Sequence, residues 1–367
     1  MNCRERFIAC MLGQKVDRAP FWLFWGEWPD TWRRWHAEGA PEHFKSHYDL
    51  QRHFEADLVP GILPINCGPC PRRDWITLQE DEHSITRLDA WGVTRRDLKG
   101  RTTMAQFLDF PIKSHSDWIA YREKWLNPDD PRRLEGPWRQ RAAEWTAQGR
   151  PIQIGYACDT GMYGAVRWLL GDEECLLAFI AQPDLIADIM NHMTDVILAV
   201  YEKVAAEVRI DMIHWWEDFC GRQGPLISPA HFRQFIGPCY GRVKDFADRH
   251  EIPVISVDTD GQPDLAIAPM MEGGVNFIFP FEVAAGCDVR QVRRKYPHLG
   301  MLGGIDKRAL AAGKEAIDAE LARVAPVISS NRYIADLDHQ VPPDVSWENF
   351  CYYAKRLKET ILAAKVR

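Results

Sequence analysis

The chain has 367 residues, of which 46% are hydrophobic and 26% are charged. This balance is that of a folded protein with a sizeable apolar core, and it excludes the disordered and disulfide-stapled classes. The net charge of −7 comes with basic residues scattered among acidic ones, so we expect no nucleic-acid partner. No window of about 18 apolar residues and no signal peptide occur, so we expect a cytoplasmic protein with no membrane partner.

The first part of the chain predicts a helix, a strand and an insertion. A short helix is expected over residues 3–12, and the apolar run 19–25 predicts a buried strand because Pro and Gly bound it. Between residues 75 and 97 apolar and polar side chains alternate. This alternation predicts a hairpin or meander inserted beside the main fold.

From residue 151 onward, strand patterns and helix patterns alternate. Strands are predicted at 151–155, 210–216, 254–257, 275–279, 299–302 and 333–336. Helices are predicted at 185–201, 263–271, 289–296, 308–324 and 347–363, with a further helix opened by Ser228-Pro229. Strands separated by helices favour parallel pairing with right-handed crossovers. We therefore expect an α/β fold, a (β/α)₈ TIM barrel with an N-terminal hairpin or meander insertion, as one domain over residues 1–367.

Polar residues follow nearly every predicted strand. They are Glu27; Asp159 and Thr160; Glu217 and Asp218; Asp258, Thr259, Asp260 and Gly261; Glu282; Asp306, Lys307 and Arg308; and Asp338 and His339. The carboxyl ends of barrel strands form the active-site face, so these groups should converge on one rim. That much negative charge in a partly desolvated pocket calls for a metal ion or a cationic substrate. The alternative is that each acidic residue only caps a helix or ties a loop.

Asp258-Thr259-Asp260-Gly261 is the sharpest local motif. Two carboxylates at i and i+2 after an extended strand point to the same side, and Gly261 permits a tight turn beneath them. The alternative is an Asx turn leading into the helix at Pro263. Cys287 could add a soft ligand from the next loop, although a lone Cys is more often a small buried hydrophobe.

Short motifs are distributed over nearly the whole chain. They are Arg4-Glu5-Arg6-Phe7, Val16-Asp17-Arg18-Ala19-Pro20, Arg167-Trp168-Leu169-Leu170-Gly171, Ile227-Ser228-Pro229, Val257-Asp258-Thr259-Asp260-Gly261, Phe279-Pro280-Phe281-Glu282, Gly303-Gly304-Ile305-Asp306-Lys307-Arg308 and Asp338-His339-Gln340-Val341-Pro342-Pro343. In order and spacing they resemble the uroporphyrinogen decarboxylase superfamily, whose fold is a (β/α)₈ barrel. The resemblance therefore implies the same architecture as the alternation of strands and helices.

The resemblance points to the cobamide-dependent methyltransferase branch of that superfamily. True uroporphyrinogen decarboxylases have an early arginine pair in a Met-Arg-Gln-Ala-Gly-Arg-like stretch that grips substrate carboxylates. Here the matching residues 21–28 read Phe-Trp-Leu-Phe-Trp-Gly-Glu-Trp, aromatic and acidic. Such a stretch offers little to hold a tetrapyrrole rich in carboxylates, so porphyrin decarboxylation is not expected.

In the methyltransferase branch a metal, commonly zinc, lies next to a corrinoid bound to a partner protein. The coenzyme M enzymes use a His-x-Cys pair after one strand and a Cys after the last, places that match Asp258, Asp260 and His339 here. Neither of the two cysteine ligands of the coenzyme M enzymes is present at these places, which suits an oxygen-rich site. In this respect the chain resembles the enzymes that demethylate phenyl methyl ethers.

These matches give the expected site. The expected metal ligands are Asp258, Asp260, Glu282, Cys287 and His339, for zinc or another divalent metal. The expected catalytic residues are Glu217, Asp218, Asp260 and His339. The expected substrate-binding residues are Trp22, Trp25, Glu27, Trp216 and Phe281. The expected partners are a small-molecule methyl donor and a corrinoid protein, and a homodimer is compatible with the resemblance.

Three alternatives stay open. The donor could be another small methylated compound, the chain could be a uroporphyrinogen decarboxylase-like protein, or it could bind a corrinoid or tetrapyrrole without catalysis.

Overall fold

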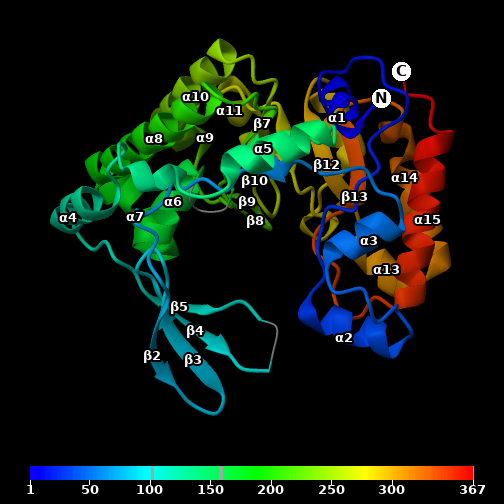
Figure 1. Cartoon of the computed structure of the whole chain (residues 1–367), viewed down its shortest axis with the longest axis horizontal. Coiled ribbons are helices and arrows are strands. Elements are labelled where there is room, and N and C mark those ends of the chain that lie inside the picture. Colours follow the sequence, from blue (N-terminus) through cyan, green and yellow to red (C-terminus); the bar gives the residue numbers. More distant parts are fainter. Residues whose placement is uncertain (101–102, 157–159, 367) are drawn as a thin grey trace.

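A curled parallel sheet with helices on its outer side forms the main body of the molecule (Figure 1). The computed structural model describes residues 1–100, 103–156 and 160–366. Within these ranges seven strands pair in the order β1-β6-β7-β10-β11-β12-β13. Their bounds are β1 (Gly61–Ile62), β6 (Ile152–Ile154), β7 (Met212–Trp216), β10 (Val254–Asp258), β11 (Phe277–Phe279), β12 (Gly300–Ile305) and β13 (Tyr333–Leu337). The fold is TIM-barrel-like, as the alternation of strands and helices predicted.

The segment 19–25, predicted as a buried strand, forms no strand ladder in the described structure. It lies between the two edge strands, β13 and β1, and contacts both sides. The N–H of Phe24 donates to the side-chain carboxylate of Asp336 in β13 at 2.6 Å, and the carbonyl of Phe21 accepts from Asp57 N, shortly before β1, at 2.8 Å. The strand prediction is wrong because a side chain, instead of a neighbouring strand's backbone, takes the Phe24 N–H. The segment is nevertheless hydrogen-bonded both to β13 and to the residues before β1.

Amphipathic helices cover the outside of the sheet. They are α6 (Met162–Leu170), α7 (Asp172–Ala181), α8 (Pro183–Ala205), α10 (Gly237–Arg249), α11 (Asp264–Glu272), α12 (Val289–Lys295), α13 (Lys307–Ala312), α14 (Lys314–Ile328) and α15 (Trp347–Ala363). The single helix predicted over 308–324 is two helices, because Gly313 adopts φ +113° between α13 and α14. No helix in the described ranges combines the length and the apolarity that crossing a membrane requires.

Helix α1 (Cys3–Met11) closes the amino-terminal end of the sheet. Its Phe7 stacks on Trp22 at 5.3 Å between ring centroids and meets Phe277, the first residue of β11, edge-on at 6.2 Å. Arg4 pairs with Asp211, which directly precedes β7. With α1 at this end, the carboxyl ends of the strands are left for the functional site.

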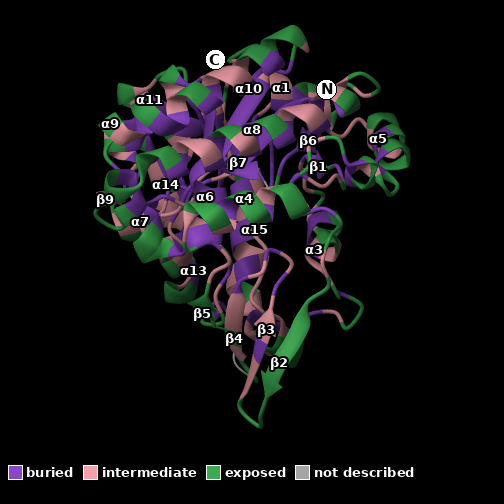
Figure 2. Ribbon diagram, turned by 90° about the vertical axis from the view of Figure 1, so that its left-hand side faces the viewer, coloured by how far each residue is buried: buried purple, intermediate pink, exposed green. Residues whose placement is uncertain are grey.

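A four-stranded antiparallel sheet is inserted after β1 and confirms the predicted meander. Its strands are β2 (Ile76–Glu80), β3 (Ser84–Leu88), β4 (Thr94–Leu98) and β5 (Gln106–Asp109). The sheet projects from the body, and its edge strand β2 is exposed along its whole length (Figure 2). The chain returns to β6 through α4 (His115–Trp125), η1 (Pro131–Leu134) and α5 (Trp138–Ala147). Because the insertion follows the end of a barrel strand, it leaves from the side where the site is expected.

Candidate active site

Six charged or titratable side chains meet where the barrel strands end. They end or follow β7, β10, β11, β12 and β13, and we call them the rim cluster: Asp218, Asp258, Asp260, Glu282, Lys307 and His339. The charges of Asp218 and Glu282 both act on Asp258 and on Asp260. The convergence predicted from the carboxyl-end rule is therefore present, and it unites residues up to 121 positions apart in the sequence, from Asp218 to His339.

The backbone after β10 explains why the two aspartates share a side. Between them, Thr259 is fully buried and its hydroxyl oxygen accepts from Phe219 N at 3.1 Å and Cys220 N at 3.2 Å. Gly261 then turns with φ +79°, and a Cβ there would lie 2.5 Å from the carbonyl oxygen of Gly221. The inward Thr259 and the glycine turn thus leave Asp258 and Asp260 facing the mouth of the barrel.

Burial and like charge raise the pKa values of these two carboxyl groups. The pKa of Asp258 is raised well above its usual value, first by burial and then by the charges of Asp260, Asp218 and Glu282. No hydrogen bond to the Asp258 carboxyl occurs among the described residues. Burial, followed by Asp218 and Glu282, raises the pKa of Asp260 to about 7. Near neutral pH Asp260 is therefore able both to give and to take a proton.

His339 faces Asp260 from the last strand end. Its Nε2 lies 3.7 Å from Asp260 Oδ1, and its ring stacks on Trp25 with centroids 4.9 Å apart and planes 20° apart. Burial, and then the charge of Lys307, lower the pKa of His339, so the imidazole is neutral at pH 7. The stacked indole fixes the plane of the ring beside the carboxyl group.

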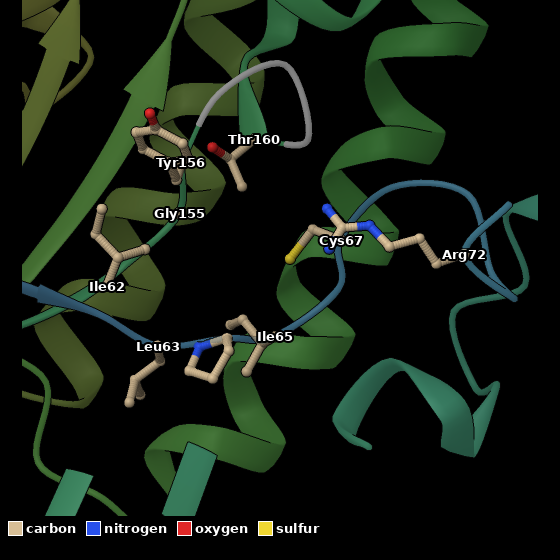
Figure 3. A pocket seen from close by; sticks show the side chains of 9 residues that line it. Ile62, Leu63, Ile65, Cys67, Arg72, Gly155, Tyr156 and Thr160 are labelled. Carbon is tan, nitrogen blue, oxygen red and sulfur yellow. The ribbon is translucent and has the colours of Figure 1, made fainter. Parts of the chain in front are cut away.

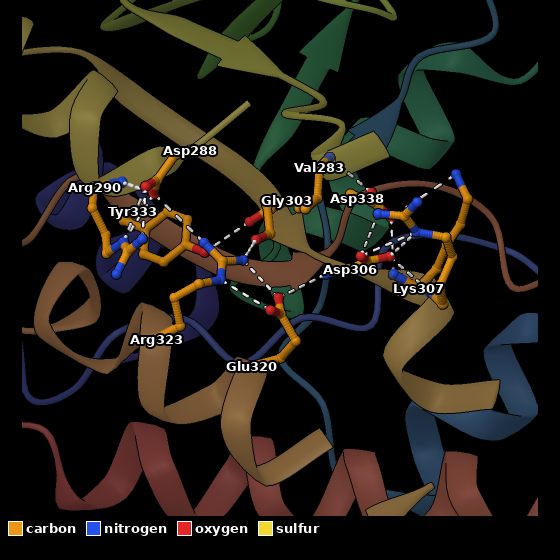
Figure 4. A network of polar contacts seen from close by, with 12 residues as sticks. Val283, Asp288, Arg290, Gly303, Asp306, Lys307, Glu320, Arg323, Tyr333 and Asp338 are labelled. Carbon is orange, nitrogen blue, oxygen red and sulfur yellow. Dashed lines mark hydrogen bonds and ion pairs between the residues drawn. The ribbon is translucent and has the colours of Figure 1, made fainter. Parts of the chain in front are cut away.

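Lys307 is the cation nearest the centre of the cluster. Its Nζ lies 3.6 Å from Glu282 Oε1 and 3.9 Å from Asp338 Oδ1. Asp338 is fully buried and accepts from the backbone N–H groups of Lys307 at 3.1 Å and Val283 at 2.9 Å (Figure 4). Asp338 thereby ties together the loops after β11, β12 and β13. It also fixes the base from which the Lys307 side chain extends.

A second cation, Arg167 of α6, holds Asp218. The guanidinium forms ion pairs with Asp218 and Asp172, and it donates to the Asp218 carbonyl at 3.1 Å. It also lies 5.6 Å above the ring of Trp216. Asp218 adopts φ +47°, a left-handed conformation that is uncommon for a residue with a side chain. Arg167 thus sets the position of one carboxylate and one aromatic surface of the rim.

Several residues expected in the site lie elsewhere. Glu217 is fully buried and accepts from Met162 N, Gly164 N and Tyr240 Oη, so it anchors the start of α6. The side chain of Glu27 is 1% exposed and pairs with His47 at 2.8 Å. The contacts of Glu217 account for it as a structural tie, whereas Glu27 is held by His47 through Oε1 alone.

Two of the expected aromatic contacts are core residues. Trp22 is 1% exposed within the packing against α1, and Phe281 is 0% exposed. Neither can touch a substrate in this structure. Trp25 and Trp216 are partly exposed and contact rim-cluster residues or their partners. Of the five expected substrate contacts, these two indoles are the ones at the mouth. Asp159 lies outside the described residues.

The expected metal ligands are not arranged as a ligand set. Among the described residues no three His, Cys, Asp or Glu side chains come together in a way that could hold a metal ion. The Cys287 thiol donates to Gly261 O at 3.3 Å, and burial raises its pKa to about 12, which opposes the thiolate that a metal needs. Glu282 Oε2 accepts from Gly261 N at 2.9 Å. The residues as arranged do not fit a metal ion, and we assign no step of the reaction to one.

Sequence reasoning missed Lys307 and Arg167 as members of the site. Lys307 stood among the rim residues, but its signal, one of two adjacent cations after β12 within an acidic rim, was outweighed by the carboxylates. Arg167 lies within a helix, and no sequence pattern ties it to Asp218. Tertiary packing of α6 against β7 brings them together.

A separate hollow opens where β1 and β6 end. It has a volume of about 180 Å³ and is lined by Ile62, Leu63, Ile65, Cys67, Arg72 and Tyr156 among others (Figure 3). It lies at the same end of the sheet as the rim cluster, but none of the six rim-cluster side chains lines it.

The comparisons with known proteins bear on this site. A model of the uroporphyrinogen decarboxylase (URO-D) family matches residues 170–360, more than half of the chain. The chain belongs to the URO-D family. No curated protein matches it. Solved structures do match, among them a methyltransferase from Methanosarcina mazei with a TM-score of 0.63 and 15% identity, over 98% of this chain and 99% of that chain. At this identity the likeness shows the shared fold, and the reaction has to be argued from the site.

Proposed function

We propose that this URO-D family member is a methyltransferase that removes the methyl group of a methoxylated aromatic compound and passes it to a corrinoid on a separate protein. One observation supports it above the others: Asp260, whose pKa is about 7, faces a neutral His339 beside Trp25 at the carboxyl ends of the strands. Family membership and the fold shared with a methyltransferase agree with this function.

The chemistry of an aryl ether explains the need for an acid. When the methyl–oxygen bond breaks, its electron pair stays on the oxygen, and the phenolate formed is a poor leaving group unless a proton reaches it. Protonated Asp260 supplies that proton. The reduced corrinoid would supply the nucleophile that accepts the methyl group. Neutral His339, 3.7 Å from Asp260, returns a proton from solvent after the phenol leaves.

The aromatic ring of the substrate needs flat, partly exposed surfaces. Trp25 and Trp216 offer them at the mouth of the barrel. Arg167 holds Asp218 and lies over Trp216, so it orients one of these surfaces. The geometry thus pairs aromatic binding with an acid at one rim.

A methyl-transfer assay tests the proposal. Purified protein is incubated with a chemically reduced free corrinoid and with 2-methoxyphenol, methoxybenzoates, a methylated amine or a methylated thiol. We expect phenol formation, followed by chromatography, together with a change in the corrinoid absorption spectrum. Asp260→Asn should reduce the rate, whereas Asp264→Asn, a carboxylate that pairs with Lys295 on the surface, should not.

Two outcomes would redirect the proposal. Transfer from the amine or the thiol alone would move the function to another methylated donor. No transfer from any donor, with folded protein, would contradict a methyltransferase.

A further inference from the structure

The ammonium group of Lys307 has no hydrogen bond of its own. The backbone N–H of Lys307 donates to Asp338, and the side chain is 21% exposed. Nζ lies 3.6 Å from Glu282 and 3.9 Å from Asp338, both longer than a hydrogen bond. No hydrogen bond and no closer ion pair of Nζ occurs among the described residues. An ammonium with three donors is therefore available to a ligand at the mouth of the barrel.

The charge of Lys307 reaches side chains from two other strand ends. It acts on Asp260 after β10, and on Asp338 and His339 after β13, lowering the pKa of each. Together with Glu282 after β11, these side chains include three of the metal ligands expected from the sequence, which do not come together as a ligand set in the described structure. Lys307 thus places a positive charge next to acidic side chains for which the sequence predicted a metal ion.

The other cation of the rim is not available in this way. Arg167 is bound by two carboxylates, Asp218 and Asp172, and by the Asp218 carbonyl. Its charge is already matched by two carboxylates, and its Nε and Nη1 donate to Asp172 and Asp218. Lys307 is therefore the rim cation with capacity for a ligand.

We infer that the Lys307 ammonium serves in place of a metal ion: it balances Glu282 and Asp338, and it donates a hydrogen bond to the substrate oxygen that loses the methyl group. The second half of this inference rests on the proposed function. During transfer the methyl–oxygen bond breaks and its electron pair stays on the oxygen. A reduced corrinoid would accept the methyl group, the oxygen would take its proton from Asp260 as in the proposed function, and Lys307 would donate its hydrogen bond without transferring a proton.

This role selects the class of methyl donor. Negative charge develops on the oxygen of an ether or ester as the methyl group leaves, and a nearby ammonium stabilises it. A methylated ammonium donor leaves as a neutral amine and gains nothing from Lys307, which would repel it in the ground state. The substrate class is therefore an O-methyl compound with an oxygen leaving group.

Metal binding and methyl transfer by three variants test the inference. Lys307→Met removes the charge at similar length, Lys307→Arg keeps the charge, and Lys314→Met removes a surface lysine that pairs with Glu348. Each protein is checked by circular dichroism, analysed for metals by mass spectrometry after dialysis against zinc chloride, and titrated with zinc chloride in a calorimeter.

We expect wild type and Lys314→Met to retain no stoichiometric zinc and to keep their activity in a chelator. Lys307→Met should bind zinc at least about tenfold more tightly than wild type, because a positive charge within about 4 Å of the carboxylates is gone. Its kcat for the ether should fall about 100-fold or more, as when an oxyanion donor is removed. Lys307→Arg should recover part of that loss.

A wild-type protein that retains one zinc ion per chain and loses activity in the chelator would overturn the inference. So would a folded Lys307→Met protein with wild-type kcat and unchanged zinc affinity. If wild type transfers no methyl group from any donor, the proposed function fails, and the zinc measurements on wild type, Lys307→Met and Lys307→Arg still decide whether Lys307 replaces a metal ion.

Discussion

Asp260 Oδ1 lies 3.7 Å from His339 Nε2. Asp260 follows β10 and His339 follows β13, so the two residues are 79 positions apart in the sequence. This distance is longer than a hydrogen bond, and such pairs often tighten when a substrate binds. Asp260 is the acid of the proposed reaction, so the properties of this pair give the first measurable consequences.

The rate of methyl transfer should fall as the pH rises above about 7. Asp260 must be protonated to act as an acid, and its pKa is about 7. Burial and the charges of Asp218 and Glu282 raise this pKa, and the charges of Lys307 and Arg167 lower it. Because the protonated fraction drops about tenfold per pH unit above the pKa, kcat should drop in the same way. The kcat of Asp260→Asn should be about 100-fold or more below that of wild type, and it should not vary with pH between about 6 and about 9. A wild-type kcat that rises over this range would contradict the acid role.

The same substitution should stabilise the fold at high pH. A carboxyl whose folded pKa is raised contributes stability below its unfolded pKa and loses it as the pH rises through the folded value. Asp260→Asn should therefore match wild type near pH 4 and exceed it at pH 8. At pH 8 the free energy of unfolding of Asp260→Asn should exceed that of wild type by about 1 kcal/mol. The gain is this small because solvent screens a side chain that is 43% exposed. Urea unfolding at both pH values measures this, and an equal difference at the two would refute it.

Glu217 should prove structural. Glu217→Ala leaves the buried donors Met162 N, Gly164 N and Tyr240 Oη without a partner, so unfolding free energy should drop by about 3 kcal/mol or more. Urea denaturation measures the loss. The kcat per folded molecule should stay near wild type at a temperature where the variant is folded. A large loss of kcat in a stable Glu217→Gln protein would instead support the catalytic role first expected from the sequence.

The order of strands and helices could be read from the sequence because burial imposes a period on each element. The predicted elements that are wrong have local causes that the pattern of apolar and polar residues does not contain. The segment 19–25 has the composition of a strand, yet the Asp336 side chain takes the Phe24 N–H. The helix expected over 308–324 is interrupted where Gly313 turns with positive φ.

The convergence of polar residues at the carboxyl ends of the strands could also be predicted, whereas the direction of each side chain could not. Glu217 and Asp218 are adjacent after β7, but the first is buried against α6 and the second, with φ +47°, faces the rim. Trp22 and Trp25 likewise separate into core and mouth. Such choices depend on neighbours distant in the sequence, as does the pairing of Arg167 with Asp218.

The ion pair between Arg167 and Asp218 gives a last prediction: removing either residue should shift the pKa of Asp260, and the two shifts should be opposite. Asp218 raises the pKa of Asp260 and Arg167 lowers it. Asp218→Asn should therefore move the fall of kcat to lower pH, and Arg167→Met should move it to higher pH. Arg167→Lys keeps the charge and should leave the midpoint closer to wild type. The pH profile of kcat, measured at saturating ether, separates these effects from losses in binding, which change KM. Shifts in the same direction for Asp218→Asn and Arg167→Met would show that Asp260 is not the group that titrates.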